Sequence, residues 1–469
     1  MHSKNPLIFR CNTDQILASN THKLTIKYAL MNKIYTCCLL ALLIGMNTFA
    51  QKVDYVEFDL DNGLHVILHQ DNSAPVVTTS VMYNVGGKDG DRSRTGFAHF
   101  FEHLLFEGSK NIGRGEFSKI VSSNGGQYNA NTSQDRTYYF ETFPSNKLEL
   151  GLWLESERML HPIINQEGVD TQNEVVKEEK RSSYDNRAYG QILFAISENL
   201  FKVHPYKDKN IGEMEHLDNA TLEEFMAYHK KYYVPNNAVL VIAGDIDLPK
   251  TMALAKAYFE EVPRGDDVVR NFPKETPITE TIKKEHYDPN IQVPAIIAAY
   301  RTPGFKSRDS YVLNMVSSYL SGGKSSKMYK KIIDTQKQAL TVQAVNIPQM
   351  DYSIYALFAL PMGDVSLQTL LDEMDEEILK MQEALISERD FQKLQNQFEN
   401  QFVNANSSIS GIANSLARNY LLYDDVNLIN TEIDIYRSIT REEIQNVVKK
   451  YLNPNQRVEI EYLKKTANQ

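Results

Sequence analysis

Just after residue 50, three segments of the chain have the residue pattern of β-strands. They alternate hydrophobic with polar positions or are rich in β-branched side chains, and they cover residues 55–59, 64–69 and 76–84. Asp61-Asn62-Gly63, between the first two segments, is a typical hairpin-turn sequence. Farther along, residues 148–160 and 367–383 are predicted helices, and such helices alternate with further strands. The pattern therefore predicts a protein of the α+β class.

A segment near the middle of the chain is repeated near its end. Residues 221–237, TLEEFMAYHKKYYVPNN, align without a gap with residues 440–456, TREEIQNVVKKYLNPNQ. Each segment ends in a Pro-Asn break, and a predicted strand follows it, residues 238–243 in the first case and 457–462 in the second. The identical order of helix, break and strand indicates that the two halves have related folds.

Both repeated segments begin with a capping box, in which a hydroxyl and a carboxylate satisfy free amides at the start of a helix. The pairs are Thr221 with Glu224 and Thr440 with Glu443. Helix–turn–strand units can share such features by chance, but identities in one register favour an internal duplication.

We therefore expect two homologous α+β domains, residues 51–265 and 278–469. The stretch between them, residues 266–277, is polar and contains prolines, as is typical of a linker. A mature chain of about 420 residues is long enough for two domains of ordinary size.

The first 50 residues are predicted to lie outside the fold. Residues 1–30 are polar and resemble an over-long start, whereas residues 31–50 have the features of a signal peptide: Lys33, an apolar run over residues 37–46, and a small residue, Ala50, before the expected cut. An uncleaved membrane anchor is the alternative, but the run is about half the length that a spanning helix needs. We expect an exported protein, in the periplasm.

The cysteine content and the net charge limit the kinds of site and partner that the chain can have. The three cysteines, Cys11, Cys37 and Cys38, all precede the expected cut, so the mature chain has no thiol for a disulfide or a metal site. Any metal ion must be bound by histidines and carboxylates. A net charge of −10 argues against a nucleic acid as partner.

The sequence His99-Phe100-Phe101-Glu102-His103 has the form H-x-x-E-H. On a helix, positions i, i+3 and i+4 share one face, so two imidazoles at this spacing can bind one Zn²⁺. The glutamate beside them can accept a proton from a water molecule. This order of residues is the inverzincin signature, and it predicts a zinc hydrolase. A surface helix that happens to carry two histidines is the alternative.

Further motifs resemble those of the pitrilysin/insulinase family of zinc metallopeptidases, in the branch of mitochondrial processing peptidase and bacterial processing-type proteases. The similarity includes GFAHFFEHLLFEGS at residues 96–109, GGQYNANT at 125–132, EVVKEE at 174–179, YDNRAYG at 184–190, HPY at 204–206, residues 233–245, and SGGKSSKMY at 321–329. The resemblance implies two homologous α/β-sandwich domains that form a half-clamshell.

The resemblance also implies the site. His99, His103 and Glu179 would hold one Zn²⁺ per chain, with Glu178 as the alternative third ligand, and Glu102 would act as the general base. The substrate chain would lie as an added strand along Asn129, Ala130 and Thr132, held by backbone hydrogen bonds. A structural glycine turn is an alternative explanation for the neighbouring Gly125-Gly126.

Two positions depart from the family pattern. Related enzymes often carry a second glutamate seven residues before the distal ligand, where this chain has Gln172, and Asp170 or Glu174 could take that role. Active members also place an arginine and a tyrosine in the second half, where this chain has Ile333 and Leu340.

We therefore expect the zinc-bearing subunit of a heterodimer, in which a homologous chain supplies the Arg/Tyr pair for an endopeptidase that cleaves peptides or unfolded segments. The alternative is a non-catalytic assembly subunit of the same fold, but such subunits usually lose pentad residues, and this chain has all three together with Glu179.

Overall fold

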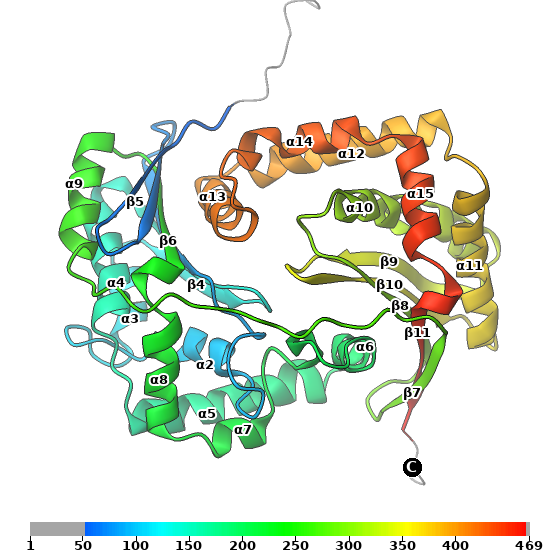
Figure 1. Cartoon of the computed structure of the whole chain (residues 1–469), viewed down its shortest axis with the longest axis horizontal. Coiled ribbons are helices and arrows are strands. Elements are labelled where there is room, and N and C mark those ends of the chain that lie inside the picture. The colour runs from blue at the N-terminus through cyan, green and yellow to red at the C-terminus, as the bar shows by residue number, and fades with distance from the viewer. Residues whose placement is uncertain (1–51, 466–469) are drawn as a thin grey trace, which may run out of the picture. The chain divides into compact units, whose positions relative to one another are not determined.

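The computed structural model describes residues 52–465, and in them the chain forms two mixed β-sheets, one in each half (Figure 1). Helices cover both sheets, so the predicted α+β class is confirmed. The predicted upstream segment, residues 1–30, and the predicted signal peptide, residues 31–50, lie outside the described residues.

The first half carries a sheet of six strands. Its strands are β1 Val56–Asp59, β2 His65–Gln70, β3 Val76–Tyr83, β4 Gln127–Thr132, β5 Thr137–Pro144 and β6 Ala238–Gly244. Its helices are α2 Phe97–Leu104, α3 Glu116–Ser123, α4 Leu148–Leu160, α5 Gln166–Lys180, α6 Ile192–Leu200, α7 Met214–Asp218, α8 Leu222–Tyr232 and α9 Leu248–Phe259, with short helical segments η1 Ser145–Lys147, η2 Arg181–Asp185, η3 Pro205–Lys207 and η4 Pro235–Asn237.

The second half carries a sheet of five strands. Its strands are β7 Ile282–Asp288, β8 Ala295–Pro303, β9 Ala339–Ile347, β10 Tyr352–Pro361 and β11 Arg457–Lys464. Its helices are α10 Arg308–Ser321, α11 Leu367–Glu383, α12 Glu388–Ala405, α13 Ile409–Tyr423, α14 Leu428–Ser438 and α15 Arg441–Tyr451, with η5 Tyr329–Thr335 and η6 Pro454–Gln456.

The two sheets have the same topology. The strand order is β1-β2-β6-β3-β5-β4 in the first and β7-β11-β8-β10-β9 in the second. In each sheet, the strand that follows the repeated segment pairs in parallel with an early strand of its half, β6 with β2 and β11 with β7, and the remaining pairs are antiparallel. Apart from β1, the sheets therefore match strand for strand, with β4 and β9 as equivalent edges.

The predicted repeat is present in three dimensions. Thr221 and Thr440 each cap a helix through a complete capping box, α8 in the first half and α15 in the second. A short 3₁₀ turn and a central strand follow both helices. The early strands β1, β2 and β3 also begin and end within one residue of the predicted positions.

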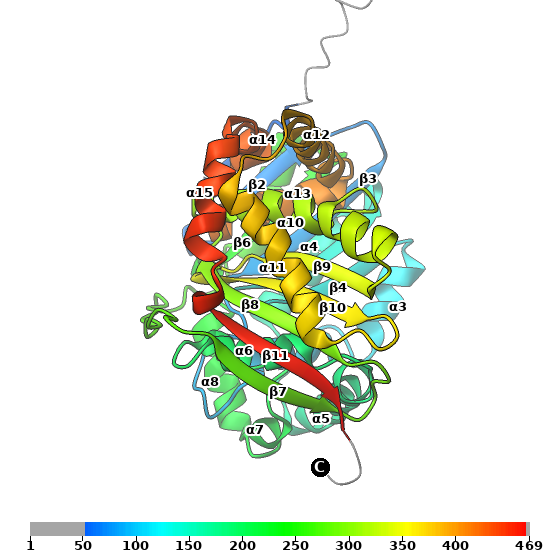
Figure 2. The same cartoon turned by 90° about the vertical axis from the view of Figure 1, so that its right-hand side faces the viewer.

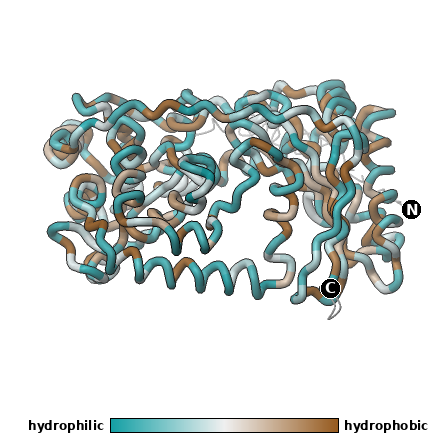
Figure 3. Tube along the Cα trace, turned by 60° about the horizontal axis from the view of Figure 1, so that its bottom comes forward, coloured by the Kyte–Doolittle hydropathy of each residue, from teal (hydrophilic) through white to brown (hydrophobic). Residues whose placement is uncertain are grey.

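Each sheet has one face that is covered by helices of its own half. In the first half, α4 packs on β3 and β5, and α9 packs on β2; in the second half, α10 packs on β9, and α11 packs on β8 and β10. In Figure 2, α11 and α15 lie in front of the second sheet. Hydrophobic and hydrophilic positions alternate along the helices, as expected for elements with one face on a core (Figure 3).

The opposite face of each sheet is covered by a helix from the other half. Helix α13 packs on β6 and β3 of the first sheet, and α6 packs on β11 and β8 of the second (Figure 1). Leu416 on α13 is fully buried in a cluster with Val239 and Val241 on β6. Ile196 on α6 lies in the matching cluster with Ile460 on β11. Helices α13 and α6 have equivalent places in their halves. Each half therefore provides one helix that covers the sheet of the other half, and we call this reciprocal arrangement the exchange.

Residues 260–281 join the halves without a helix or strand. The domain boundaries at residues 265 and 278 stay a prediction. Within the described region, none of the helices combines the length and apolar character that crossing a membrane requires.

Because α13 completes the core of a sheet in the other half, we expect Leu416→Ala to lower the free energy of unfolding by about 2–5 kcal/mol, the usual range for a buried leucine. Urea unfolding measures the change. Leu379→Ala on α11 is the matched control, because Leu379 is 49% exposed and should cost less than about 0.5 kcal/mol. Equal losses of unfolding free energy in the two variants would contradict a stabilising role for the contact between α13 and the first sheet.

Candidate metal centre

The pentad lies on helix α2, as predicted, and a glycine starts this helix. Gly96 is the N-cap, with φ of +91°, a left-handed conformation that favours glycine. A Cβ at this position would come within 2.7 Å of the Ile211 carbonyl oxygen and 2.8 Å of the Gly212 Cα. Glycine is therefore needed both for the turn into α2 and for its close contact with the loop before α7.

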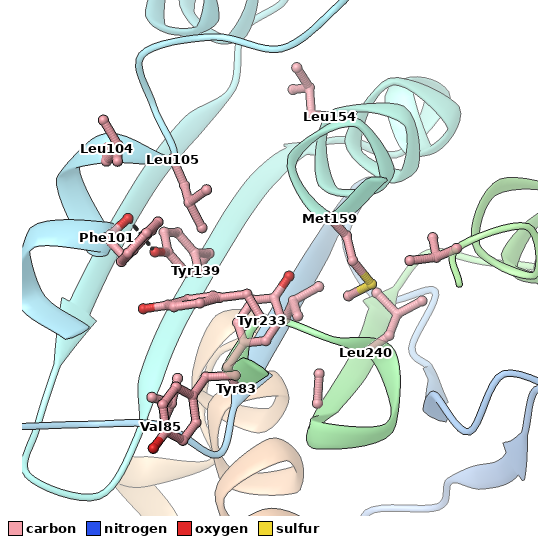
Figure 4. Close-up of a cluster of buried hydrophobic side chains, with 14 of the residues drawn as sticks. Tyr83, Val85, Phe101, Leu104, Leu105, Tyr139, Leu154, Met159, Tyr233 and Leu240 are labelled. Atoms are coloured by element: carbon pink, nitrogen blue, oxygen red, sulfur yellow. Dashed lines mark hydrogen bonds between the residues drawn. The ribbon is translucent and has the colours of Figure 1, made fainter. Parts of the chain in front are cut away.

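Two phenylalanines of the pentad fix the rotation of α2 about its axis. Phe100 and Phe101 are fully buried, and the ring of Phe101 lies 5.1 Å from that of Tyr233. The Tyr139 hydroxyl on β5 donates a 2.9 Å hydrogen bond to the Phe101 carbonyl, drawn as a dashed line in Figure 4. Phe100 packs against Phe225 of α8 at 4.8 Å. With this side anchored, the side chains of positions 99, 102 and 103 share the opposite side.

His99, His103 and Glu179 come together, although Glu179 belongs to another helix, α5. The Glu179 Oε2 atom lies 3.4 Å from His99 Nε2 and 3.2 Å from His103 Nε2. The three possible ligand atoms lie within 4.8 Å of one another, and among residues 52–465 this is the one group of three or more histidine, cysteine or acidic residues with such spacing.

These three residues fit a zinc ion. The Oε2 atom of Glu179 is buried and accepts no hydrogen bond from the described part of the chain, although two imidazole nitrogens face it. The imidazoles of His103 and His99 hold the pKa of Glu179 well below its usual range, so the carboxylate is ionised at neutral pH. Two imidazoles and one carboxylate, with room for a fourth ligand, are a typical donor set of catalytic zinc.

The neighbouring Glu178 does not lie in this cluster. Its side chain is 70% exposed and pairs with Arg181 at 3.2 Å on the outer side of the helix. Directly after Glu179 and Lys180, α5 changes into the π-helical segment η2. Irregular helical turns of this kind are frequent at functional sites.

Glu102 lies beside the candidate metal ligands and is oriented by strand β4. The Thr132 hydroxyl donates a hydrogen bond of 2.6 Å to Glu102 Oε2. The backbone carbonyl of Thr132 accepts a hydrogen bond of 2.8 Å from the Asn210 side chain, so Thr132 is itself held in place. The sequence placed Thr132 on the substrate strand but gave no sign of its contact with Glu102.

Strand β4 forms one edge of the first sheet, so its outer side has no neighbouring strand among the described residues. Asn129 is exposed and Ala130 is half-buried. The Asn129 side-chain oxygen accepts a hydrogen bond of 2.9 Å from the Ala130 amide. The predicted substrate strand is therefore a free edge next to Glu102.

Gln172 stands where related enzymes often carry a second glutamate, and its side chain contacts neither Asp170 nor Glu174 but a third carboxylate. The Gln172 side-chain amide donates a hydrogen bond of 2.5 Å to Glu107, a residue just beyond α2 that the sequence did not single out. Asp170 instead accepts from Gln166, and Glu174 pairs with Lys177. The carboxylate that contacts residue 172 therefore comes from a different element.

Tyr184 is a further residue without a sequence-based role. It lies on η2, five residues beyond Glu179, and its ring packs against Phe194 at 4.9 Å. Burial raises the pKa of Tyr184, and the charges of Glu179 and Glu102 raise it further, so the phenol stays protonated near both carboxylates. Its place one turn after the predicted distal ligand is the signal that could have revealed it.

The two positions that lack the Arg/Tyr pair lie in the second half. Ile333 is on η5 and packs against the hydrophobic core of that half. Leu340 is on the edge strand β9 and is 53% exposed. Neither side chain can donate a hydrogen bond.

Comparison with protein families gives two matches that follow each other along the chain. Residues 65–212, which contain the pentad and Glu179, match the model described as Insulinase (Peptidase family M16). Residues 219–398 match the model described as Peptidase M16 inactive domain.

Similar proteins agree with these matches. The chain is 28% identical over 405 residues to the zinc protease PqqE of Helicobacter pylori, an alignment that covers 85% of this chain and 90% of that protein. The crystal structure of a protease from Helicobacter pylori has a TM-score of 0.83 at 26% identity, covering 87% and 99% of the two chains.

The periplasmic protease PqqL from Escherichia coli shares the fold, with a TM-score of 0.74 at 19% identity, and the match covers 87% of this chain but 48% of that protein. Two successive family matches, a relative aligned along most of both chains, and a shared fold together show that the chain belongs to the insulinase (M16) family of peptidases.

Proposed function

We propose that this protein is a zinc-dependent endopeptidase that hydrolyses peptides or unfolded polypeptide segments, with one zinc ion per chain. The observation that carries the proposal is the meeting of His99, His103 and Glu179 beside the carboxylate of Glu102. The zinc proteases among its relatives support the same chemistry.

The chemistry needs a metal site, a base and a way to orient the base. Bound zinc would lower the pKa of a water molecule and polarise the peptide carbonyl. Glu102 would accept the proton of the attacking water and deliver it to the leaving amine. The hydrogen bond from Thr132 holds one carboxylate oxygen, which leaves the other free for this transfer.

The edge strand β4 would bind the substrate. An extended peptide could add to this edge through backbone hydrogen bonds at Asn129, Ala130 and Thr132, and its scissile bond would then lie beside Glu102. Recognition through the backbone is largely independent of side chains, and this suits unfolded segments of many sequences as substrates.

The second half would depend on a partner for full activity. Ile333 and Leu340 cannot donate hydrogen bonds to a substrate carbonyl, so a homologous chain would supply an Arg/Tyr pair. The match to about half of the longer PqqL protease fits a unit that works beside a second one of the same fold.

We also propose that the protein is exported, to the periplasm. The support is the signal-peptide pattern of residues 31–50 and the absence of cysteine after residue 38.

Metal content tests the ligand assignment. We expect one zinc per chain in the wild type, and more than about a hundredfold weaker binding in His103→Ala and Glu179→Gln, since even losing a hydrogen-bond partner of a ligand costs 10–100-fold. Elemental analysis after dialysis against a weak chelator measures the change. Glu178→Gln is the matched control and should keep its zinc; loss of zinc in this variant alone would reverse the assignment.

Glu102→Gln separates an enzyme from an assembly subunit. We expect this variant to keep its zinc and to lose about 10²–10⁴-fold in kcat on a quenched fluorescent peptide, because the amide cannot accept the proton. Glu174→Gln, at an exposed site on α5, should cleave like the wild type. A wild type that cleaves no peptide in any assembly, with a Glu102→Gln variant that assembles normally, would favour the non-catalytic subunit.

The isolated chain tests the heterodimer. We expect it to bind zinc but to cleave about a hundredfold more slowly than after addition of a homologous chain that carries the Arg/Tyr pair and lacks the pentad. The peptide assay is run on each chain alone and on the mixture. The same mixture made with Glu102→Gln is the control for activity of the partner itself. Full activity of the isolated chain would refute the heterodimer.

A further inference from the structure

A cluster of charged and polar side chains lies where the two halves meet, and we name it the Asp135 cluster: Lys88, Asp135 and Tyr206, which are buried, and Asp351, which is partly exposed. Lys88 Nζ lies 2.8 Å from Asp135 Oδ1 and 3.1 Å from Asp351 Oδ2. The side chains of Lys88 and Asp135 are only 1% and 6% exposed. Tyr206 donates a hydrogen bond of 2.5 Å to Asp135 Oδ1.

The second half of the chain reaches this cluster through the turn between β9 and β10. The backbone amide of Met350 donates to Asp135 Oδ2 at 3.0 Å, and the amide of Asp351 donates to the Tyr206 hydroxyl at 3.1 Å. His204 Nε2 also lies 3.4 Å from Asp351 Oδ2. The HPY motif at residues 204–206 therefore joins the two halves and lies outside the metal centre.

Asp135 belongs to the tight turn between β4 and β5. The Ser133 hydroxyl accepts hydrogen bonds from the amides of Asp135 and Arg136, which shapes the turn. The amides of Gly87 and Lys88 donate to the carbonyls of Ser133 and Gln134, at 3.0 and 3.1 Å. The turn is thus held by its own side chains, by the loop after β3, and by the second half through Asp135.

Thr132 is the last residue of β4 before this turn, and its hydroxyl is the group that orients Glu102. A displacement of the turn would move Thr132, and with it the hydrogen bond of 2.6 Å to Glu102. The cluster is a costly way to gain stability alone, because buried ion pairs often do no better than well-packed apolar residues. Hydrogen bonds have fixed directions, so the cluster is suited to hold the β4–β5 turn in one position.

We propose that Asp135 is a positioning residue: held by Lys88, Tyr206 and the backbone of Met350, it fixes the β4–β5 turn so that Thr132 orients the carboxylate of Glu102. This rests on the proposed function, in which Glu102 is the general base. It makes the second half of the chain part of the active site of the first, through the four side chains of the cluster and the backbone amides of Met350 and Asp351.

Tyr206→Phe tests the proposal with a small change of structure, because it removes one hydroxyl and keeps the ring. We expect unchanged zinc content and a kcat about tenfold lower in the active assembly, within the range of coupling between contacting residues. In a Thr132→Val background the same change should cost less than about twofold, because the contact it supports is already lost. Equal losses in both backgrounds, or no loss in either, would overturn the proposal.

Tyr462→Phe is the matched control. Its hydroxyl also donates to a buried aspartate, Asp288, at 2.8 Å, but it lies on β11 of the second sheet. We expect a similar loss of stability and an unchanged kcat. A loss of kcat equal to that of Tyr206→Phe would indicate a general effect of instability and would also overturn the proposal.

Hydrogen exchange gives a measurement that does not need activity. In Tyr206→Phe, the amides of residues 127–137 should exchange faster than in the wild type, whereas Tyr462→Phe should leave them unchanged. Unchanged exchange in Tyr206→Phe overturns the proposal whatever the activity. Faster exchange in a protein whose wild type cleaves nothing in any assembly supports the anchoring of the turn and contradicts the proposed function instead.

Discussion

A β-sheet has two faces, and each half of this chain has its own helices for only one of them. The apolar side chains of β6 and β3 need α13 from the second half, and those of β11 and β8 need α6 from the first. Hydrophobic burial therefore requires both halves to be present and to hold a fixed relation. The contacts between the halves that reach the candidate site depend on this relation.

The candidate site shows a division of tasks between rigid helices and a strand. The candidate metal ligands lie on α2 and α5, and the buried Phe100 and Phe101 set the direction in which α2 presents its histidines. The carboxylate of Glu102 is oriented separately, from the edge strand β4. Sites with supporting contacts of this kind keep reacting groups within the small tolerances that catalysis needs.

Local features of this fold could be predicted from the sequence, because they depend on neighbouring residues. The capping boxes of Thr221 and Thr440 and the spacing of the pentad are examples. Glu179 could be found only by resemblance, since nothing local distinguishes it from Glu178. The sequence shows that a helix such as α13 is amphipathic, but not which sheet it covers.

Contacts between segments that are far apart in the sequence could not be predicted, because they depend on tertiary packing and not on neighbouring residues. The hydrogen bonds from Thr132 to Glu102 and from Gln172 to Glu107 each join residues that tertiary packing brings together. At position 172 the sequence showed only that this chain lacks the carboxylate that related enzymes often carry there. The structure shows an amide that contacts a carboxylate from elsewhere, which pattern analysis of a single segment cannot reveal.

The exchange of α6 and α13 also sets an order in time. A chain that grows from its N-terminus completes β6 at Gly244 but does not complete α13 until Tyr423, about 180 residues later. At typical rates of synthesis this interval lasts roughly 10–40 seconds. Throughout it, the apolar face around Val239 and Val241 has no native partner. The first sheet therefore lacks the cover of its second face until a helix in the last part of the chain has been made.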